Sequence, residues 1–364
     1  MTEPARMRVG LAGASYGAAM HAPAYRLLPE SELVAVCTAH RESAERAAAE
    51  LGLSRFYTDV AALAQDPEVD LVDVATRPRL HRAMVLPALR AGKHVLSEAP
   101  LALDSAEGEE LVNAAEGLIA VVDMQSRYVP ALEHMRNLVR EGFVGEVEAV
   151  TASAVYPTFT LPERALSALW CAEAANGASS LRVHGLHTAD LVEWMVSPIA
   201  AVSGIAALRR QTWPGPQGRI RATSHDHSAV AFRLLSGAIG TLQTSWVAWH
   251  GPGWRLDLQG GEGRLLATAA GHTPHFPVTL AGARADDAEL RRLEPPEDLF
   301  DVPELERDAA FYPFARLVRR LALAVAGEGP APGPGFQQGL RMLRLAEAVE
   351  ASHRESRWID LGPP

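Results

Sequence analysis

Residues 8–18 read RVGLAGASYGA, a short apolar run that leads directly into a glycine-rich turn. Such a run is typical of a buried β-strand. The turn at residues 13–18 then opens a helix. This is the context in which backbone N–H groups and a helix N-terminus bind a pyrophosphate. The stretch therefore predicts an α/β domain that binds a nicotinamide dinucleotide.

The glycine spacing departs from the strict pattern G-x-G-x-x-G. Its second and third glycine positions are Ser15 and Ala18, while Gly17 keeps the turn tight. An ordinary strand-to-helix turn is the alternative interpretation of this motif taken alone. We expect the following residues of the turn to contact the cofactor: Gly13, Ser15, Tyr16 and Gly17.

Apolar β-like runs alternate with amphipathic helical stretches from residue 8 to about residue 122. This alternation predicts a parallel sheet covered on both faces, the Rossmann arrangement, over residues 6–122. The expected strands are residues 8–12, 32–37, 71–75, 94–96 and 119–122. The expected helices are residues 42–51, 60–64, 81–91 and 105–115.

The alternation stops after Pro130, and longer β-like runs follow with fewer helices between them. They predict a second α/β domain over residues 123–364, with an open, mostly antiparallel sheet. The expected strands are residues 147–155, 200–208, 228–234, 238–247, 255–259 and 263–268. Two closing helices are expected at residues 304–326 and 337–354.

Composition narrows the function classes. The chain of 364 residues carries 34 basic and 44 acidic residues, and no basic cluster stands out, so nucleic acid is not an expected partner. The two cysteines, Cys37 and Cys171, form no disulfide or metal-binding pattern, which favours a reducing cytoplasm. We expect a soluble protein with a small-molecule substrate, without a membrane segment and without a metal.

The end of the second expected strand bears on the choice of cofactor. An acidic residue that binds the ribose hydroxyls of NAD is common there, but residues 36–41 read VCTAHR. Thr38 is uncharged, so no negative charge at this position repels the 2′-phosphate of NADP, and Arg41 can pair with that phosphate. NADP is therefore favoured, with NAD possible. The alternative is that Arg41 is only solvated on the following helix.

Several segments together resemble the Gfo/Idh/MocA oxidoreductases, the glucose-fructose oxidoreductase and inositol dehydrogenase family. The resemblance runs over residues 8–361, and it implies a second domain whose open sheet often joins subunits, hence a homodimer or homotetramer. The segments that carry it are residues 13–18 with His21 after them, 91–101, 125–130, 142–147 and 187–190.

The resemblance also implies roles for individual residues. Glu98 matches a glutamate near the nicotinamide ribose, and Thr76 with His81 matches a segment beside it. Arg127 and Tyr128 match an arginine-aromatic pair at the mouth of the site. His187 matches the histidine that faces substrate, while Asp190 in the same motif is interpreted as structural.

Two catalytic groups of the family are missing from the chain. Ala99 stands where the family has a lysine between Glu98 and Pro100, and Val183 stands where it has an aspartate. A positioned proton donor contributes roughly 100-fold to 10,000-fold in rate. The Gal80-like branch, which includes a transcriptional repressor, also lacks the lysine, and so do the thiazolinyl imine reductases.

Two functions follow from this pattern. The favoured one is an NAD(P)-dependent oxidoreductase that transfers hydride between nicotinamide and a carbonyl, sugar or imine with a non-standard catalytic set. The alternative is a catalytically silent, Gal80-like sensor. His184 lies near His187 on the expected helix, so it joins His187 and Tyr128 as a candidate proton donor. The candidates for substrate binding are Arg127, Trp170 and Arg182.

Overall fold

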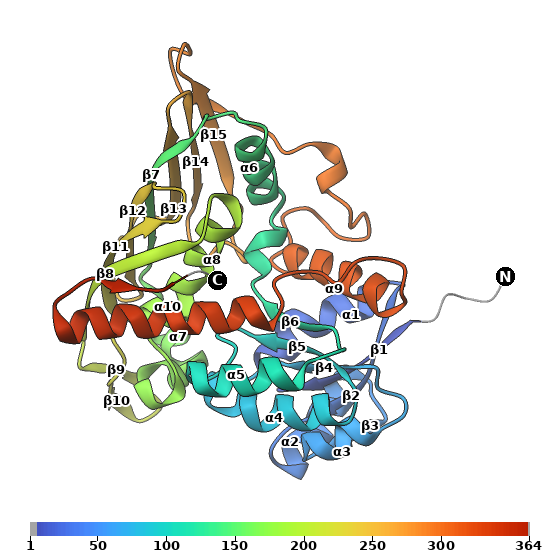
Figure 1. The fold of residues 1–364 in the computed structure, drawn as a ribbon. Coiled ribbons are helices and arrows are strands. Elements are labelled where there is room, and N and C mark those ends of the chain that lie inside the picture. Colours follow the sequence, from blue (N-terminus) through green and yellow to red (C-terminus); the bar gives the residue numbers. More distant parts are fainter. Residues whose placement is uncertain (1–5, 363–364) are drawn as a thin grey trace. The chain divides into compact units, whose positions relative to one another are not determined.

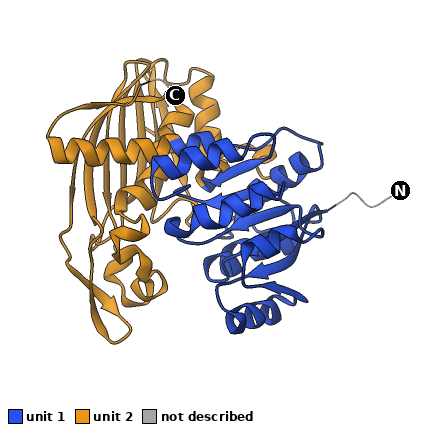
Figure 2. Cartoon of the chain, turned by 60° about the horizontal axis from the view of Figure 1, so that its bottom comes forward, with its two compact units in different colours: residues 1–125, 301–340 blue, residues 126–300, 341–364 orange. Residues whose placement is uncertain are grey.

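The computed structural model describes residues 6–362 and divides the chain into two compact units. The first contains the residues up to Gln125 together with Asp301–Leu340, and the second contains Ser126–Phe300 together with the residues from Arg341 onward (Figure 2). We expected a boundary at residue 122, with the last helices packing back across the chain. The division by contacts falls after Gln125, and the segment Asp301–Leu340 lies in the first unit.

A six-stranded parallel sheet forms the centre of the first unit (Figure 1). Its strand order, β3-β2-β1-β4-β5-β6, is that of a Rossmann fold, so the predicted domain type is confirmed. All five expected strands are present, and the short edge strand β3 was not expected. The strands are β1 (Met7–Ala12), β2 (Ser31–Cys37), β3 (Arg55–Tyr57), β4 (Leu71–Val74), β5 (His94–Glu98) and β6 (Ala120–Asp123).

Helices connect these strands and cover the sheet. Each expected helix is found, with α4 beginning earlier because Pro78 occupies its first turn, where proline is tolerated. The helices are α1 (Ala22–Leu27), α2 (Arg41–Leu51), α3 (Val60–Gln65), α4 (Pro78–Arg90) and α5 (Ser105–Ala114). A π-helical turn, η1 (Gly17–His21), precedes α1.

Helix α9 (Tyr312–Val325) belongs to the segment that returns to the first unit. It contacts α1 and β2 through an apolar face that includes Phe314 and Leu321. A helix was expected to start at residue 304, but Pro313 marks the first turn of α9, and residues 304–311 form turns instead.

The second unit is built on a nine-stranded sheet with the order β16-β15-β14-β13-β7-β12-β11-β8-β17. Among the strands described, β7 and β12 form its one parallel pair, so the sheet is mixed but mostly antiparallel, as expected. The strands are β7 (Val147–Val155), β8 (Ile199–Ala207), β11 (His227–Leu234), β12 (Ile239–Ser245), β13 (Gly253–Gly260), β14 (Gly263–Ala269), β15 (Thr279–Arg284), β16 (Arg291–Arg292) and β17 (Ile359–Asp360).

Helices and a small hairpin complete this unit. The long helix α10 packs Val349 against Gly204 of β8, where any added Cβ would lie 2.8 Å from the valine. The hairpin, which was not predicted from the sequence, buries Trp213 against Phe159 and Trp246. The elements are α6 (Pro130–Arg140), α7 (Pro162–Ser167), α8 (Leu186–Met195), α10 (Phe336–Glu355), β9 (Thr212–Gly215) and β10 (Gly218–Arg221).

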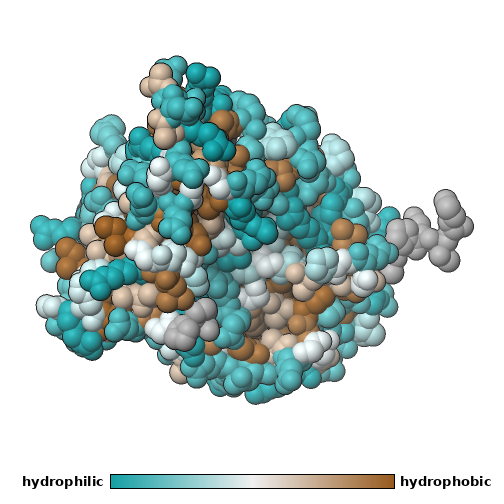
Figure 3. Space-filling model, turned by 45° about the horizontal axis from the view of Figure 1, so that its top comes forward, coloured by the Kyte–Doolittle hydropathy of each residue, from teal (hydrophilic) through white to brown (hydrophobic). Residues whose placement is uncertain are grey.

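The surface drawn in Figure 3 is mostly hydrophilic, with apolar residues in small separate groups. Within residues 6–362, no helix has the length and apolar character needed to cross a membrane. Both cysteines are buried as free thiols.

Candidate functional site

The glycine turn after β1 is fixed by close backbone contacts. Gly13 has φ +112°, and its N–H donates to the carbonyl of Cys37 at 3.0 Å. A Cβ added at Gly13 would lie 2.3 Å from the carbonyl oxygen of Ala75, and one at Gly17 would lie 2.8 Å from Leu11 Cδ1. Only glycine therefore fits at position 13, at the carboxyl end of β1 where a Rossmann fold binds pyrophosphate.

Hydroxyl groups gather at the start of α2, beyond the end of β2. Thr38 Oγ1 lies 2.6 Å from Ser43 Oγ, with either hydroxyl as the donor, and both oxygens lie within hydrogen-bond distance of the carbonyl of His40, at 3.1 and 2.8 Å. Arg41 is exposed, pairs with Glu45 at 2.8 Å and lies over the ring of Phe56. Two hydroxyls, an exposed guanidinium and a helix N-terminus are groups that can bind a phosphate.

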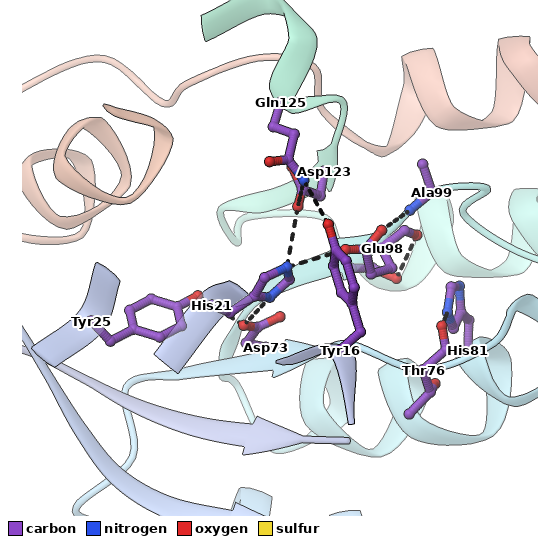
Figure 4. A network of polar contacts seen from close by, with 11 residues as sticks. Tyr16, His21, Tyr25, Asp73, Thr76, His81, Glu98, Ala99, Asp123 and Gln125 are labelled. Atoms are coloured by element: carbon purple, nitrogen blue, oxygen red, sulfur yellow. Dashed lines mark hydrogen bonds and ion pairs between the residues drawn. The ribbon is translucent and has the colours of Figure 1, made fainter. Parts of the chain in front are cut away.

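His21 lies at the centre of a buried polar network in the first unit (Figure 4). Its Nδ1 is 2.8 Å from Asp73 Oδ2, and its Nε2 is 3.1 Å from Glu98 Oε1 and 3.5 Å from Asp123 Oδ2. We call these four residues the His21 cluster. They come from η1 and from the carboxyl-terminal parts of β4, β5 and β6, so the parallel sheet brings them to one edge.

Neighbouring side chains hold the His21 cluster in place. Tyr25 donates to Asp73 Oδ2 at 3.0 Å, and the ring of Phe314 stacks on His21 at 3.9 Å between ring centroids. Gln125 donates to Asp123 Oδ2 at 3.1 Å and to the Tyr16 hydroxyl at 3.4 Å. The backbone N–H of Ala99 donates to Glu98 Oε2, so residue 99 contributes only its backbone to this contact.

Burial and mutual repulsion set the charges of the His21 cluster. Burial and the neighbouring Glu98 raise the pKa of Asp123 well above its usual range. Burial lowers the pKa of His21, but Asp73 and Glu98 outweigh it and the net shift is strongly upward. These shifts favour an imidazolium at His21 and a neutral carboxyl group at Asp123.

One ligand atom from each of His21, Glu98 and Asp123 lies within 4.8 Å of the others, a spacing that a metal ion could use. No local pattern in the sequence indicates such a group. Both ring nitrogens of His21 already face carboxylates, and Asp123 already accepts from Gln125. In this structure the group forms a hydrogen-bonded network.

Hydrogen bonds from the buried ring of His81 hold the segment that was expected beside Glu98. His81 is fully buried, with Nε2 2.9 Å from the carbonyl of Thr76 and Nδ1 3.0 Å from that of Pro100. Burial lowers the pKa of His81, so the ring is neutral. His81 thus links the backbone after β4 to the backbone after β5. These hydrogen bonds help to position Thr76 and, through the adjoining backbone, Glu98.

A second group of polar side chains, in the second unit, contains the expected His184 and His187. The ring centroid of His272 lies 5.2 Å from that of His184 and 4.8 Å from that of His187. His275 lies 5.8 Å from His272, measured the same way. The prediction that His184 and His187 share one side of the helix is consistent with their common contact, although His184 lies in a π-helical turn, η6 (Leu181–Gly185).

The environment of these histidines is apolar and aromatic. The ring of His184 meets the edges of Tyr156 at 5.0 Å and Trp246 at 5.9 Å. Burial, with smaller contributions from His187 and His275, lowers the pKa of His184 to about 3. Burial also lowers the pKa of His272 well below its usual range. Both rings are therefore neutral at physiological pH.

The arginines expected to bind substrate are held by carboxylates within the second unit. Arg127 donates through Nε and Nη2 to both oxygens of Asp190, at 2.7 and 2.6 Å. Arg182 makes a similar pair with Glu350, with its Nε at 2.7 Å. These fork-to-carboxylate pairs fix helix α8 and helix α10 in this unit.

The two expected aromatic residues occupy different settings. Tyr128 is buried in the 3-10 turn Gln125–Tyr128. Trp170 is partly buried and packs against the aromatic core around Trp213, and its carbonyl accepts from Asn176 at 3.0 Å.

Sequence reasoning missed Asp73, Asp123 and His272. Asp73 interrupts the apolar strand Leu71–Val74, and such a polar interruption of a buried strand is a usable signal. His272 lies in an irregular segment after β14, where no periodicity marks it.

Comparison with known proteins identifies the family. Residues 7–125 match the model of an oxidoreductase family with an NAD-binding Rossmann fold, and residues 132–266 match the Gfo/Idh/MocA C-terminal domain. The chain belongs to the Gfo/Idh/MocA oxidoreductase family. Its relatives are named dehydrogenases and reductases, and the chain is accordingly an NAD(P)-dependent oxidoreductase of the sugar-type group.

Individual relatives extend over the full chain. The dTDP-3,4-didehydro-2,6-dideoxy-alpha-D-glucose 3-reductase of Streptomyces violaceoruber is 31% identical, over 99% of this chain and 98% of that protein. An oxidoreductase domain protein from Kribbella flavida has a TM-score of 0.88 at 28% identity, covering 98% of this chain and 100% of that one. The super-repressor mutant of Gal80p from Saccharomyces cerevisiae has a TM-score of 0.82 at 17% identity, covering 98% of each chain, a likeness of fold alone.

Proposed function

We propose that this chain is an NADPH-dependent reductase of a keto sugar. The observation that carries the proposal is the retained His187 among buried histidines, in a chain whose residues 99 and 183 are alanine and valine. The full-length similarity to a reductase of a dTDP-linked keto sugar supports this substrate class. The reaction moves a hydride from nicotinamide C4 to the carbonyl carbon and a proton to its oxygen.

The cofactor part of the proposal rests on the start of α2. Thr38, Ser43 and Arg41 can together receive a 2′-phosphate, and no acid occupies the end of β2 to repel it. The Gly13 turn and the N-terminus of η1 receive the pyrophosphate, with Ser15, Tyr16 and Gly17 beside it. Thr76 and Glu98, positioned by His81, face the nicotinamide ribose.

The proton part rests on His187. We assign the proton that goes to the substrate oxygen to His187, which matches the substrate-facing histidine of the family and contacts His272, with His184 and Tyr128 as the other candidates. The substrate-binding role that we propose is indirect for three residues, which hold the elements of the second unit around the substrate through ion pairs and packing: Arg127, Arg182 and Trp170.

The test is turnover of dTDP-3,4-didehydro-2,6-dideoxy-α-D-glucose, followed by loss of NADPH absorbance. Oxidation of NADPH with a matching yield of reduced sugar supports the proposal. Tight NADPH binding without turnover of this sugar, free ketoses or cyclic imines contradicts it and favours a Gal80-like sensor.

Assembly and location complete the proposal. The face of the nine-stranded sheet that lies away from α10 exposes Ile205 and Ile239. We propose that a second copy of the chain covers this face in a homodimer or homotetramer. Light scattering tests this, since a monomer at micromolar concentration contradicts it. We propose the cytoplasm as the location, because both thiols are unpaired.

A further inference from the structure

The His21 cluster brings three carboxyl groups around one imidazole with almost no access to solvent. The side chains of His21, Asp73 and Asp123 are 0% exposed, and that of Glu98 is 15% exposed. If all three carboxyl groups were ionised, even an imidazolium would leave two uncompensated negative charges in a buried site. Such burial of charge is costly, and bound protons relieve it.

The contacts of the cluster support proton sharing. Neither Asp73 nor Asp123 pairs with an arginine or lysine in the described part of the chain, and each has one buried carboxyl oxygen, Oδ1, without a hydrogen-bond partner there. A buried carboxylate oxygen that receives no hydrogen bond is destabilised, and the neutral, protonated carboxyl group is then favoured over the carboxylate. Burial correspondingly raises the pKa of Asp123.

The place of the cluster in the fold connects it to the cofactor. Glu98 and Asp123 end β5 and β6, at the carboxyl edge of the sheet and on the side of β1 that carries the nicotinamide half of a dinucleotide in Rossmann folds. Glu98, the partly exposed member, is the route between this edge and the buried groups. The nicotinamide ring is neutral when reduced and carries one positive charge when oxidised.

We infer that the His21 cluster is a proton-storing site whose proton occupancy follows the redox state of the bound dinucleotide. A positive nicotinamide near Glu98 favours the more negative cluster, so the oxidised cofactor releases a proton from it. The neutral reduced cofactor lets the cluster retain that proton. Ala99 leaves the cluster without the cation that a lysine would add at this position, and a stored proton takes its place. The inference rests on dinucleotide binding within the proposed function, and it does not depend on which sugar is reduced.

Other titratable groups face the cluster, and all remain uncharged or paired near neutral pH. Tyr16 and Tyr25 are phenols, and burial raises the pKa of Tyr25. From α9 the contact is the ring of Phe314, while the arginines of that helix pair with carboxylates elsewhere. Those pairs are Arg316 with Asp301, Arg319 with Glu30 and Glu304, and Arg320 with Asp301.

The test counts protons during cofactor binding. Isothermal titration calorimetry of the full-length protein with NADPH and with NADP⁺, in buffers of different ionisation enthalpy, gives the protons bound or released between about pH 6 and about pH 9. If NADH and NAD⁺ bind more tightly, that pair is used. We expect NADP⁺ to release more protons than NADPH, by a substantial fraction of one proton. Equal counts across the range would overturn the inference.

Substitutions in the His21 cluster test whether the difference in proton release between NADP⁺ and NADPH comes from this cluster. Asp123→Asn and Asp73→Asn should each at least halve the difference, while Glu116→Gln, at an exposed carboxylate of the same unit, should leave it unchanged. An unchanged difference in both aspartate variants contradicts the inference. Infrared difference spectra of the wild-type protein, NADPH-bound minus NADP⁺-bound, should show the carbonyl stretch of a protonated carboxylic acid, and this readout needs no variant to fold.

The remaining outcomes separate the possible failures. Absence of any binding heat and of any fluorescence change with dinucleotides contradicts the proposed function itself. Normal binding with equal proton counts contradicts only the storage of a proton. Stoichiometric zinc or manganese in the purified protein, with a proton difference that disappears after chelation, would replace the stored proton with a metal ion.

Discussion

The carbonyl oxygen of Ala75 lies so close to Gly13 that a Cβ at residue 13 would approach it to 2.3 Å. Gly13 also has a positive φ of +112°, which a side chain would strain. The backbone that follows β4 therefore limits which residue can follow β1, and both this contact and the positive φ require a glycine at position 13.

Gly13→Ala should destabilise the folded chain by about 2 kcal/mol or more and weaken dinucleotide binding at least about tenfold, because the clash is with backbone. Urea unfolding and fluorescence titration measure the two effects. Gly92→Ala is the matched control, since Gly92 also has a positive φ, of +76°, but no atom lies within 4 Å of its added Cβ. Equal losses in the two variants would show that conformation alone, not the contact with Ala75, is responsible.

Arg41→Ala should weaken NADPH binding by about tenfold or more and leave NADH binding nearly unchanged, because only NADPH carries the 2′-phosphate. Intrinsic tryptophan fluorescence during titration gives both affinities. Arg46→Ala, at an exposed residue of the same helix, is the control for the loss of a positive charge. Tighter binding of NADH than of NADPH by the wild-type protein would contradict the role of Arg41.

His187→Ala should reduce kcat by about 100-fold or more on a verified substrate, with little change in NADPH affinity, because it removes the proton donor that we propose. His184→Ala and Tyr128→Phe test the two other candidates in the same assay, and His250→Asn, at an exposed histidine, is the control. If all three variants retained wild-type turnover with hydride transfer rate-limiting, the proton would have to come from solvent.

His184 should make the stability of the protein depend on pH below neutrality. Its pKa is about 3 in the folded chain and near 6.5 when unfolded, so the unfolded state binds the additional proton. The contribution of neutral His184 to the free energy of unfolding is fully present above about pH 6.5. It is lost as pH falls toward 3, by at most about 5 kcal/mol, because the unfolded state takes up the proton first.

His184→Phe removes this titration while keeping an aromatic ring against Tyr156 and Trp246. Urea unfolding between about pH 4 and about pH 7 should therefore show a shallower loss of stability in the variant than in the wild-type protein. His250→Asn should follow the wild-type curve. Parallel curves for His184→Phe and the wild-type chain would show that His184 binds protons equally well in both states.

The boundaries of strands and helices show where local pattern was sufficient and where it was not. The ends of the parallel strands were predicted to within about two residues, since apolar β runs between glycine turns are a local signal. The start of α9 was predicted about eight residues too early, because residues 304–311, which read ELERDAAF, mix polar and apolar side chains and have no local feature that separates turns from helix.

The sequence by itself determined the Rossmann order of strands and helices and the glycine turn at Gly13, and it places an alanine at position 99 and a valine at position 183. These features depend on residue type and on spacing along a short stretch. The tertiary structure alone decided that Asp73 and Asp123 surround His21, that His272 contacts both His184 and His187, and that α9 packs in the first unit. Those contacts join residues far apart in the chain, and their partners are set by strand order and by which faces the folded units bury, which no local pattern contains.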